Sequence, residues 1–435
     1  MAAIRRRVGR LSALSGALAA ALTTAILGFA GAASAAPELT TLFAFTDGVT
    51  GEHPWAAPIL GPDGALYGVT IDGGASDDGV VYRLTPQEAG KPWKYKALHE
   101  FRGGRDGADP IAGLAMGPSG ALYGVTSAGG GGECSGGCGV VYELAPKGDG
   151  SFAYDVIYRF KRVADGVRSS SRLVMDDDGA LYGTTAAGGA YDRGTAFSLR
   201  KAKSGWKKKI LHSFAGGKDD GRFPDAGVVF GPDGMLYGTT RVGGAVSGDR
   251  GTVYRLARSS ASGLWKAKLL HRFTGGPDGE QPTGPLAFDR DGALYGATSL
   301  GGGGTCFGGC GTVFRLALRA AKGWRKETIH SFTGGQSDGA SPRAGLVADG
   351  AGALWGATPG GGPNPSVGVI FNLTPPRKPD GAWSEKIVRA FTGSGGEGGV
   401  PFDGLILDGA TGDFYGSTRD GGNATGSGTV FRLRP

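Results

Sequence analysis

The sequence has little net charge and few of the residues that most often build reactive sites. Its formal charge is +7, but four arginines lie within residues 5–10 with no acidic residue near them, so the remainder carries about +3. Such a balance gives no indication of a nucleic-acid partner. Only five histidines and four cysteines are present among 435 residues. Beyond residue 33 no apolar run is long enough to cross a bilayer, so we expect no membrane span.

The N-terminal segment has the form of an export signal. The arginines precede an apolar run from about Leu11 to Ala33, and Ala33-Ser34-Ala35 fits the small-x-small pattern of a cleavage site. We predict a signal peptide over residues 1–36 and a secreted or periplasmic protein. No cysteine lies near the predicted cleavage point, which argues against a lipoprotein anchor.

Glycine is unusually abundant, at 87 residues. The strict three-residue period of collagen is absent, and 40% of the residues are hydrophobic, which argues against disorder. Glycine-rich turns between short apolar and aromatic segments are typical of an all-β fold.

One short motif recurs seven times along the chain. Its copies are Leu66-Tyr67-Gly68, Leu122-Tyr123-Gly124, Leu181-Tyr182-Gly183, Leu236-Tyr237-Gly238, Leu294-Tyr295-Gly296, Leu354-Trp355-Gly356 and Phe414-Tyr415-Gly416. They lie 55 to 60 residues apart and leave no room for a linker or a second domain. A steady period of this length indicates repeated supersecondary units.

Each unit has the pattern of four short strands. In the second unit we expect them at about residues 111–116, 121–126, 139–145 and 152–160. Four strands joined as a meander make a propeller blade, so residues 37–435 are predicted to form a single all-β domain, a seven-bladed β-propeller. The last unit stops after its third strand. Residues 39–45 supply a spare strand, which we expect to complete that blade and close the ring.

Basic residues gather on the fourth strand of the units. They are Lys94, Lys96, Lys207, Lys208, Lys209, Lys266, Lys268, Arg325, Lys326 and Lys386. Exposed edge strands use such charges to prevent edge-to-edge pairing. We therefore expect the fourth strand to be outermost and its basic side chains to be exposed.

The repeat resembles the GloVer tandem repeat. The resemblance rests on Leu-Tyr-Gly-x-Thr followed by Gly-Gly and then Gly-Thr-Val-(Phe/Tyr)-Arg-Leu, for example at residues 236–244 with 251–256 and at 294–302 with 311–316. It covers all seven units but implies no active site. Members of this family often end in a sorting or anchoring segment. This sequence ends at Arg434-Pro435 without one, so we expect a released protein.

Most histidines fall at one repeated position. His99, His212, His271 and His330 each stand two residues before a phenylalanine of the fourth strand. A residue type repeated around a ring indicates a structural role more than a catalytic one. Only His53 lies elsewhere, in the loop that leads into the next unit.

The loops between units carry the variable polar residues. In most units the loop runs from that phenylalanine through an Asp-Gly pair to a proline, and the two residues before the proline differ between units. In a meander blade this loop and the second-to-third-strand loop open on the same face. We predict a ligand-binding face there, with these candidate residues: Glu52, His53, Asp109, Arg168, Arg222, Phe223 and Arg241. Its arginines suit an anionic ligand, although a solvated loop surface is the simpler interpretation.

The cysteines form two matching local pairs. Cys134 with Cys138, and Cys306 with Cys310, each lie in a glycine-rich loop. For an exported protein we predict two short disulfides. A zinc site would need the pairs side by side, and they lie three blades apart, so we expect no metal and no cofactor.

The sequence does not identify a reaction. We expect a monomeric, non-enzymatic binding or surface-associated module for an extracellular ligand, either a polysaccharide such as an anionic glycan or a surface protein. The alternative is a carbohydrate-active enzyme such as a polysaccharide lyase, in which His53 and Arg168 or Arg222 would act on an acidic sugar. A purely structural extracellular protein is a third possibility.

Overall fold

The computed structural model describes residues 36–435 except 47, 89–90, 245–247, 260–262, 320–322, 365–366 and 379–380. The predicted signal peptide, residues 1–36, lies outside these residues apart from Ala36 and stays a prediction. Residues Pro37–Pro435 form one compact unit. Among the described residues, no helix is long and apolar enough to cross a membrane.

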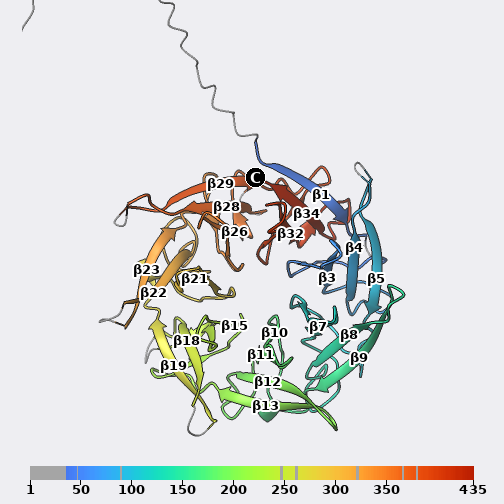
Figure 1. Cartoon of the computed structure of the whole chain (residues 1–435). Coiled ribbons are helices and arrows are strands. Elements are labelled where there is room, and N and C mark those ends of the chain that lie inside the picture. The colour runs from blue at the N-terminus through green and yellow to red at the C-terminus, as the bar shows by residue number, and fades with distance from the viewer. Residues whose placement is uncertain are drawn as a thin grey trace, which may run out of the picture. The chain divides into compact units, whose positions relative to one another are not determined.

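The described residues fold into seven four-stranded antiparallel sheets arranged as the blades of a ring (Figure 1). In the first four blades the strands run outward in chain order. They are β2 (Ile59–Leu60), β3 (Leu66–Thr70), β4 (Val80–Thr85) and β5 (Lys94–Glu100); β6 (Ala115–Met116), β7 (Leu122–Val125), β8 (Val140–Pro146) and β9 (Phe152–Arg159); β10 (Val174–Met175), β11 (Leu181–Thr185), β12 (Thr195–Ala202) and β13 (Gly205–Ser213); β15 (Val228–Phe230), β16 (Leu236–Thr240), β18 (Thr252–Arg258) and β19 (Trp265–Arg272).

The remaining three blades follow the same order. They are β20 (Ala287–Phe288), β21 (Leu294–Thr298), β22 (Thr312–Arg319) and β23 (Gly323–Ser331); β25 (Val347–Ala348), β26 (Leu354–Thr358), β28 (Val369–Thr374) and β29 (Ser384–Ala390); and β31 (Ile406–Leu407), β32 (Phe414–Thr418), β34 (Thr429–Arg434) and β1 (Glu38–Ala44). The predicted seven-bladed β-propeller is confirmed.

The N-terminal strand completes the last blade. Strand β1 pairs antiparallel with β34, with Leu39 opposite Leu433 and Ala44 opposite Thr429. Figure 1 shows this blue strand beside the red C-terminal strands. Leu42 and Phe45 are buried in a cluster that joins the seventh blade to the first. The first and last parts of the chain therefore close the ring together, as predicted.

The hydrophobic core lies between neighbouring blades. One cluster joins Tyr67 and Val81 of the first blade to Leu122 and Tyr142 of the second, and equivalent clusters recur around the ring. In each blade the second strand is buried along its whole length, as β3 is in the first blade. Each blade therefore needs both neighbours to bury its two faces.

The innermost strands are shorter than the sequence predicts. In the second blade only Ala115 and Met116 pair as β6, although a strand from 111 to 116 was expected. Residues 111–113 instead line the central cavity. Strands converge toward the axis of a ring, so less room remains there for pairing.

Two loops of each blade lie at the same end of the ring. The D–A loop connects the fourth strand of one blade to the first strand of the next, and the B–C loop connects the second and third strands. In every blade they pair with each other, at Glu52–Asp72, Ala108–Ala128, Val167–Ala187, β14 (Gly221–Arg222) with β17 (Val242–Gly243), Glu280–Leu300, β24 (Gly339–Ala340) with β27 (Gly360–Gly361), and β30 (Gly398–Gly399) with β33 (Asp420–Gly421). Two D–A loops also contain a 3-10 turn, η1 (Val163–Asp165) and η2 (Gly276–Asp278).

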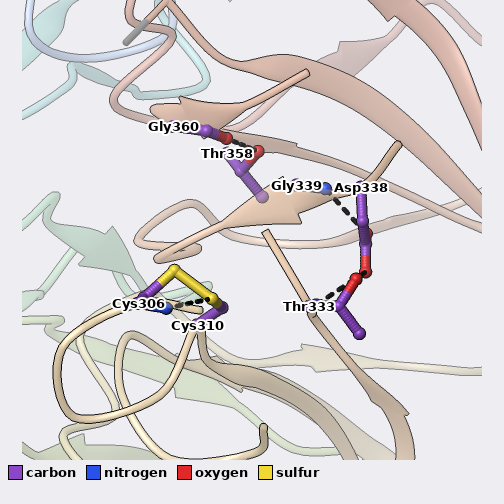
Figure 2. The surroundings of a disulfide bond; sticks show 7 residues. All are labelled: Cys306, Cys310, Thr333, Asp338, Gly339, Thr358 and Gly360. Carbon is purple, nitrogen blue, oxygen red and sulfur yellow. Dashed lines mark hydrogen bonds between the residues drawn. A yellow bond between two sulfur atoms is a disulfide. The ribbon is translucent and has the colours of Figure 1, made fainter. Parts of the chain in front are cut away.

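Both predicted disulfides are present. Cys134 is bonded to Cys138 and Cys306 to Cys310. Figure 2 shows the second disulfide and the residues around it. It lies against Gly334 of the D–A loop, because a Cβ there would stand 2.8 Å from Sγ of Cys310. These disulfides and the propeller fold fit an extracellular or periplasmic protein.

Candidate functional site

The residue before the repeat proline, or before Ser169 that replaces it in the third unit, has the same unusual backbone in all seven blades. His53, Asp109, Arg168, Phe223, Gln281, Ser341 and Val400 have φ between 53° and 59°. A non-glycine residue rarely adopts this left-handed conformation. The backbone explains it, because Phe223 N–H donates to the Arg193 carbonyl of the preceding blade and the Phe223 carbonyl accepts from Arg241 N–H, both at 2.9 Å. The side chains are left free to differ.

The residue after the proline lines a cavity along the ring axis. These residues are Trp55, Ile111, Ser170, Asp225, Thr283, Arg343 and Phe402, and the cavity has a volume of about 820 Å³. Sequence reasoning missed them. The available signal was their position directly after the repeat proline, or after Ser169 in the third unit, where the residue type differs in every unit. Variation at a fixed position of a repeat indicates a surface that is not needed for packing the blades.

An aromatic pair stands at the seam between the seventh and first blades. The rings of Trp55 and Phe402 have centroids 4.0 Å apart. The guanidinium of Arg343 lies 5.2 Å from the Phe402 centroid, and that of Arg419 lies 5.8 Å from the Trp55 centroid. Arg419 is also paired with Asp420 through two hydrogen bonds of 2.8 Å. The cavity wall therefore combines flat apolar surface with positive charge.

A second group of charges lines the cavity from the fourth and sixth blades. Arg241 Nε donates to Asp225 Oδ2 at 2.7 Å, and the Arg241 guanidinium lies 5.2 Å from the Phe223 ring. Burial raises the pKa of Asp225, although Arg241 opposes this rise. Burial and the charge of Arg241 both lower the pKa of Arg343. Within the described part of the chain, Arg343 has no hydrogen bond or ion pair.

One arginine reaches past the second blade, because a Cβ at Gly113 would stand 2.5 Å from its Nη2. Arg172 occupies the third position after Ser169, which replaces the repeat proline in this unit, and the other blades have Gly, Ala or Pro at the equivalent position. Its guanidinium donates to the Ala57 carbonyl at 2.9 Å and lies 4.0 Å from the Asp403 carboxylate. Asp403 in turn accepts from Ala57 N–H at 3.1 Å. Arg172 thus links the third, first and seventh blades and narrows the cavity.

Of the predicted site residues, only Arg241 lines the cavity. The others lie around it, in the loops that open at the same end of the ring. Arg222 pairs with Asp249 at 2.6 Å, and Arg168 is exposed. His53 Nδ1 lies 2.8 Å from Asp72 Oδ2.

Two further predicted site residues, Glu52 in the first blade and Asp109 in the second, also lie outside the cavity lining. Glu52 accepts a hydrogen bond from Gly48 N–H at 2.6 Å. Burial, followed by the charges of Asp72 and Asp78, raises the pKa of Asp109.

The repeated histidines have a structural partner. His99, His212 and His271 each place Nε2 3.0–3.1 Å from the aspartate of the following Asp-Gly pair, namely Asp106, Asp220 and Asp278. On the outer strand of the second blade, Tyr158 donates to Asp165 in the same way, at 2.8 Å. These side chains hold the start of each D–A loop against the outer strand, which agrees with the structural role predicted for the histidine position.

The prediction that all outer-strand lysines are exposed is wrong for two of them. The side chains of Lys208 and Lys326 are only 3% and 4% exposed. Each pairs with an aspartate of the preceding blade, Asp165 at 3.1 Å and Asp278 at 2.9 Å respectively. Alternate side chains of a strand point to opposite faces, so every second position of the outer strand faces the neighbouring blade.

Comparison with known proteins supports the fold and the repeat. A sequence profile of the Gloeobacter/Verrucomicrobia repeat matches residues 31–217 and 131–335. No significant match is found among curated protein sequences.

Solved structures that resemble the chain carry different activities. An ancestral GH74 enzyme is 13% identical with a TM-score of 0.53, over 88% of this chain and 48% of that one. PorZ, a surface component of the type-IX secretion system of Porphyromonas gingivalis, is 15% identical with a TM-score of 0.47, over 90% and 47%. An ulvan lyase is 13% identical with a TM-score of 0.41, over 75% and 83%. At 13% identity the likeness to the GH74 enzyme shows the propeller fold alone.

Proposed function

The chain belongs to the Gloeobacter/Verrucomicrobia repeat family, and we propose that it is an exported, non-enzymatic module that binds an anionic glycan at the cavity end of the ring. The observation that carries this proposal is the cavity wall, where the Trp55–Phe402 pair lies between the guanidinium groups of Arg343 and Arg419. A sugar ring presents an apolar face that packs on aromatic side chains, and its acidic substituents pair with arginine.

The cavity position supports a ligand larger than a single ion. The volume of about 820 Å³ falls in the range of small-molecule sites, and the variable loops of all seven blades surround it. Arg168 adds an exposed positive charge at the rim, and Arg222 adds a guanidinium that is paired with Asp249. One sugar unit of a glycan could therefore occupy the cavity while neighbouring sugar units contact the rim.

The direct test measures binding of an acidic polysaccharide, such as polygalacturonate, against neutral dextran. Binding of the acidic glycan should weaken as salt rises, because ions screen exposed charges within about 10 Å at 0.1 M. The double variant Trp55→Ala/Phe402→Ala should lose binding. Arg168→Ala/Arg222→Ala should weaken it without lowering the melting temperature.

The matched control is Lys207→Ala/Lys209→Ala on the outer strand β13, where both side chains are exposed. Lys208 is unsuitable because it is buried against Asp165. If the control abolishes binding while the cavity and rim variants retain it, the ligand binds the outer edge of the ring and this proposal is wrong.

A carbohydrate-active enzyme, such as a polysaccharide lyase, is the second candidate. The observation that favours it is the His53–Asp72 contact, because a carboxylate can orient a histidine for proton transfer. A lyase would release unsaturated sugar ends, and His53→Ala would abolish their release while leaving binding intact. Binding without any product after prolonged incubation would reject this candidate.

A further inference from the structure

We propose that the cavity contains an oxyanion subsite in which Arg241 and Arg343 bind one carboxylate or sulfate group of the glycan across the fifth blade. This inference rests on the proposed function for the nature of the ligand. It adds which group of the ligand is recognised and which residues recognise it.

Arg343 is an arginine of the cavity wall that has no acidic partner among the described residues. Three other arginines at this end of the ring have an acidic partner, Arg419 with Asp420, Arg222 with Asp249 and Arg250 with Glu280. No acidic side chain among the described residues pairs with Arg343, which lines the same cavity as Arg241 and is influenced by its charge. Two guanidinium groups that repel each other across a cavity form a favourable place for an anion.

Asp225 positions Arg241 but occupies only one of its donor nitrogens. Asp225 accepts only its Nε, at 2.7 Å, and the Phe223 ring supports the guanidinium plane. The two terminal nitrogens remain available to donate to a ligand. With Asp225 ionised, the three side chains carry one net positive charge, which one bound oxyanion would balance.

The fifth blade lies between the blades that carry the two arginines. Its contributions at the equivalent positions are Thr283 and Ser299, which are small and neutral. The Thr283 hydroxyl is buried and has no hydrogen-bond partner in the described part of the chain. Because Thr283 also lines the cavity, this hydroxyl is a candidate donor to the same oxyanion. The Ser299 hydroxyl already donates to the Gln281 carbonyl at 3.1 Å.

The experiment compares three glycans on matched variants by calorimetric titration. The probes are oligogalacturonate, its carboxyl-reduced form with the same linkages, and a sulfated galactan without carboxylates. The variants are Arg343→Met, Arg343→Lys, Thr283→Val and, as control, Arg290→Met. Arg290 is an exposed arginine of the fifth blade, which also carries Thr283. It lies in the turn between β20 and β21, away from the cavity.

Arg343→Met should weaken binding of the charged oligosaccharide by at least about tenfold, as expected for loss of a charge-assisted contact. Its affinity for the carboxyl-reduced oligosaccharide should not change, so the preference for charge disappears. Arg343→Lys should recover part of that preference, and Arg290→Met should behave like the unaltered protein. The sulfated galactan shows which oxyanion the subsite prefers.

The outcomes separate this inference from the proposed function. If the unaltered protein binds oligogalacturonate and Arg343→Met keeps the full preference for the charged form, the subsite is wrong while glycan binding stands. If the unaltered protein binds none of the three glycans, the proposed function and the subsite both fail. A melting temperature for each variant distinguishes lost recognition from lost folding.

Discussion

The glycine of each Leu-Tyr-Gly motif lies beneath an aromatic ring of the third strand. A Cβ at Gly68 would stand 2.3 Å from Oη of Tyr82, and a Cβ at Gly356 would stand 2.5 Å from the Phe371 ring. Neither glycine has a positive φ. Close approach, and not backbone freedom, therefore requires glycine at this position of the repeat.

Gly68→Ala should lower the free energy of unfolding by about 1–3 kcal/mol, because the added methyl group overpacks the core. Denaturant unfolding measures the change. The control is Gly350→Ala, where a Cβ would meet nothing within 4 Å. Equal stability of the two variants would contradict the close-contact explanation.

Asp278 is the residue whose titration should matter most for acid stability. Burial opposes its ionisation, but hydrogen bonds from His271 and Lys326 outweigh burial and lower its pKa. Because the folded-state pKa lies below the unfolded value of about 3.9, this contribution is complete above about pH 5 and is lost as the pH falls toward the lower folded-state value.

Asp278→Asn should therefore destabilise the protein by about 3 kcal/mol at pH 7, since it leaves the buried Lys326 charge without its partner. Melting temperatures between pH 7 and pH 2 should converge with those of the unaltered protein as the pH falls. Asp291→Asn, at an exposed turn position, removes the same charge and should have little effect at any pH. A constant difference at all pH values would show that ionisation of Asp278 is not the cause.

At the scale of elements, the disulfides tie short B–C loops rather than blades. Each links cysteines four residues apart, so little chain entropy is removed from the unfolded state. Replacing Cys306 and Cys310 together by alanine should cost about 2 kcal/mol or less. Urea unfolding gives this value, and non-reducing peptide mapping checks the pairing. Free thiols or a cross-pair between the two loops in the exported protein would contradict the assignment.

At the scale of the whole molecule, stability depends on closing the ring. Deleting residues 37–46 removes β1, leaves β34 as an open edge and exposes the cluster around Leu42 and Phe45. We expect a lower melting temperature for the entire domain and a tendency to self-associate through the new edge. Scanning calorimetry and light scattering measure both. A single transition at the original temperature would show that the closing strand is dispensable.

Much of the fold follows from the sequence because the repeat is local. Each Leu-Tyr-Gly motif, its turns and its outer phenylalanine lie within one blade, so period and polarity predict blade number, strand order and loop ends. The two short disulfides could also be predicted from the sequence, since the cysteines of each pair are close in the chain. The exposure of outer-strand lysines was only partly predictable, because it depends on which face meets the neighbouring blade.

The candidate site required the tertiary structure. Arg241 and Arg343 are 102 residues apart in the sequence, and Trp55 and Phe402 come from opposite ends of the chain. Only the closed ring brings each pair to one cavity. The sequence by itself determined the blades, since short-range patterning specifies each hairpin. The tertiary structure decided which variable residues face the axis, because the curvature of the ring and the position of each first strand are set by packing between blades.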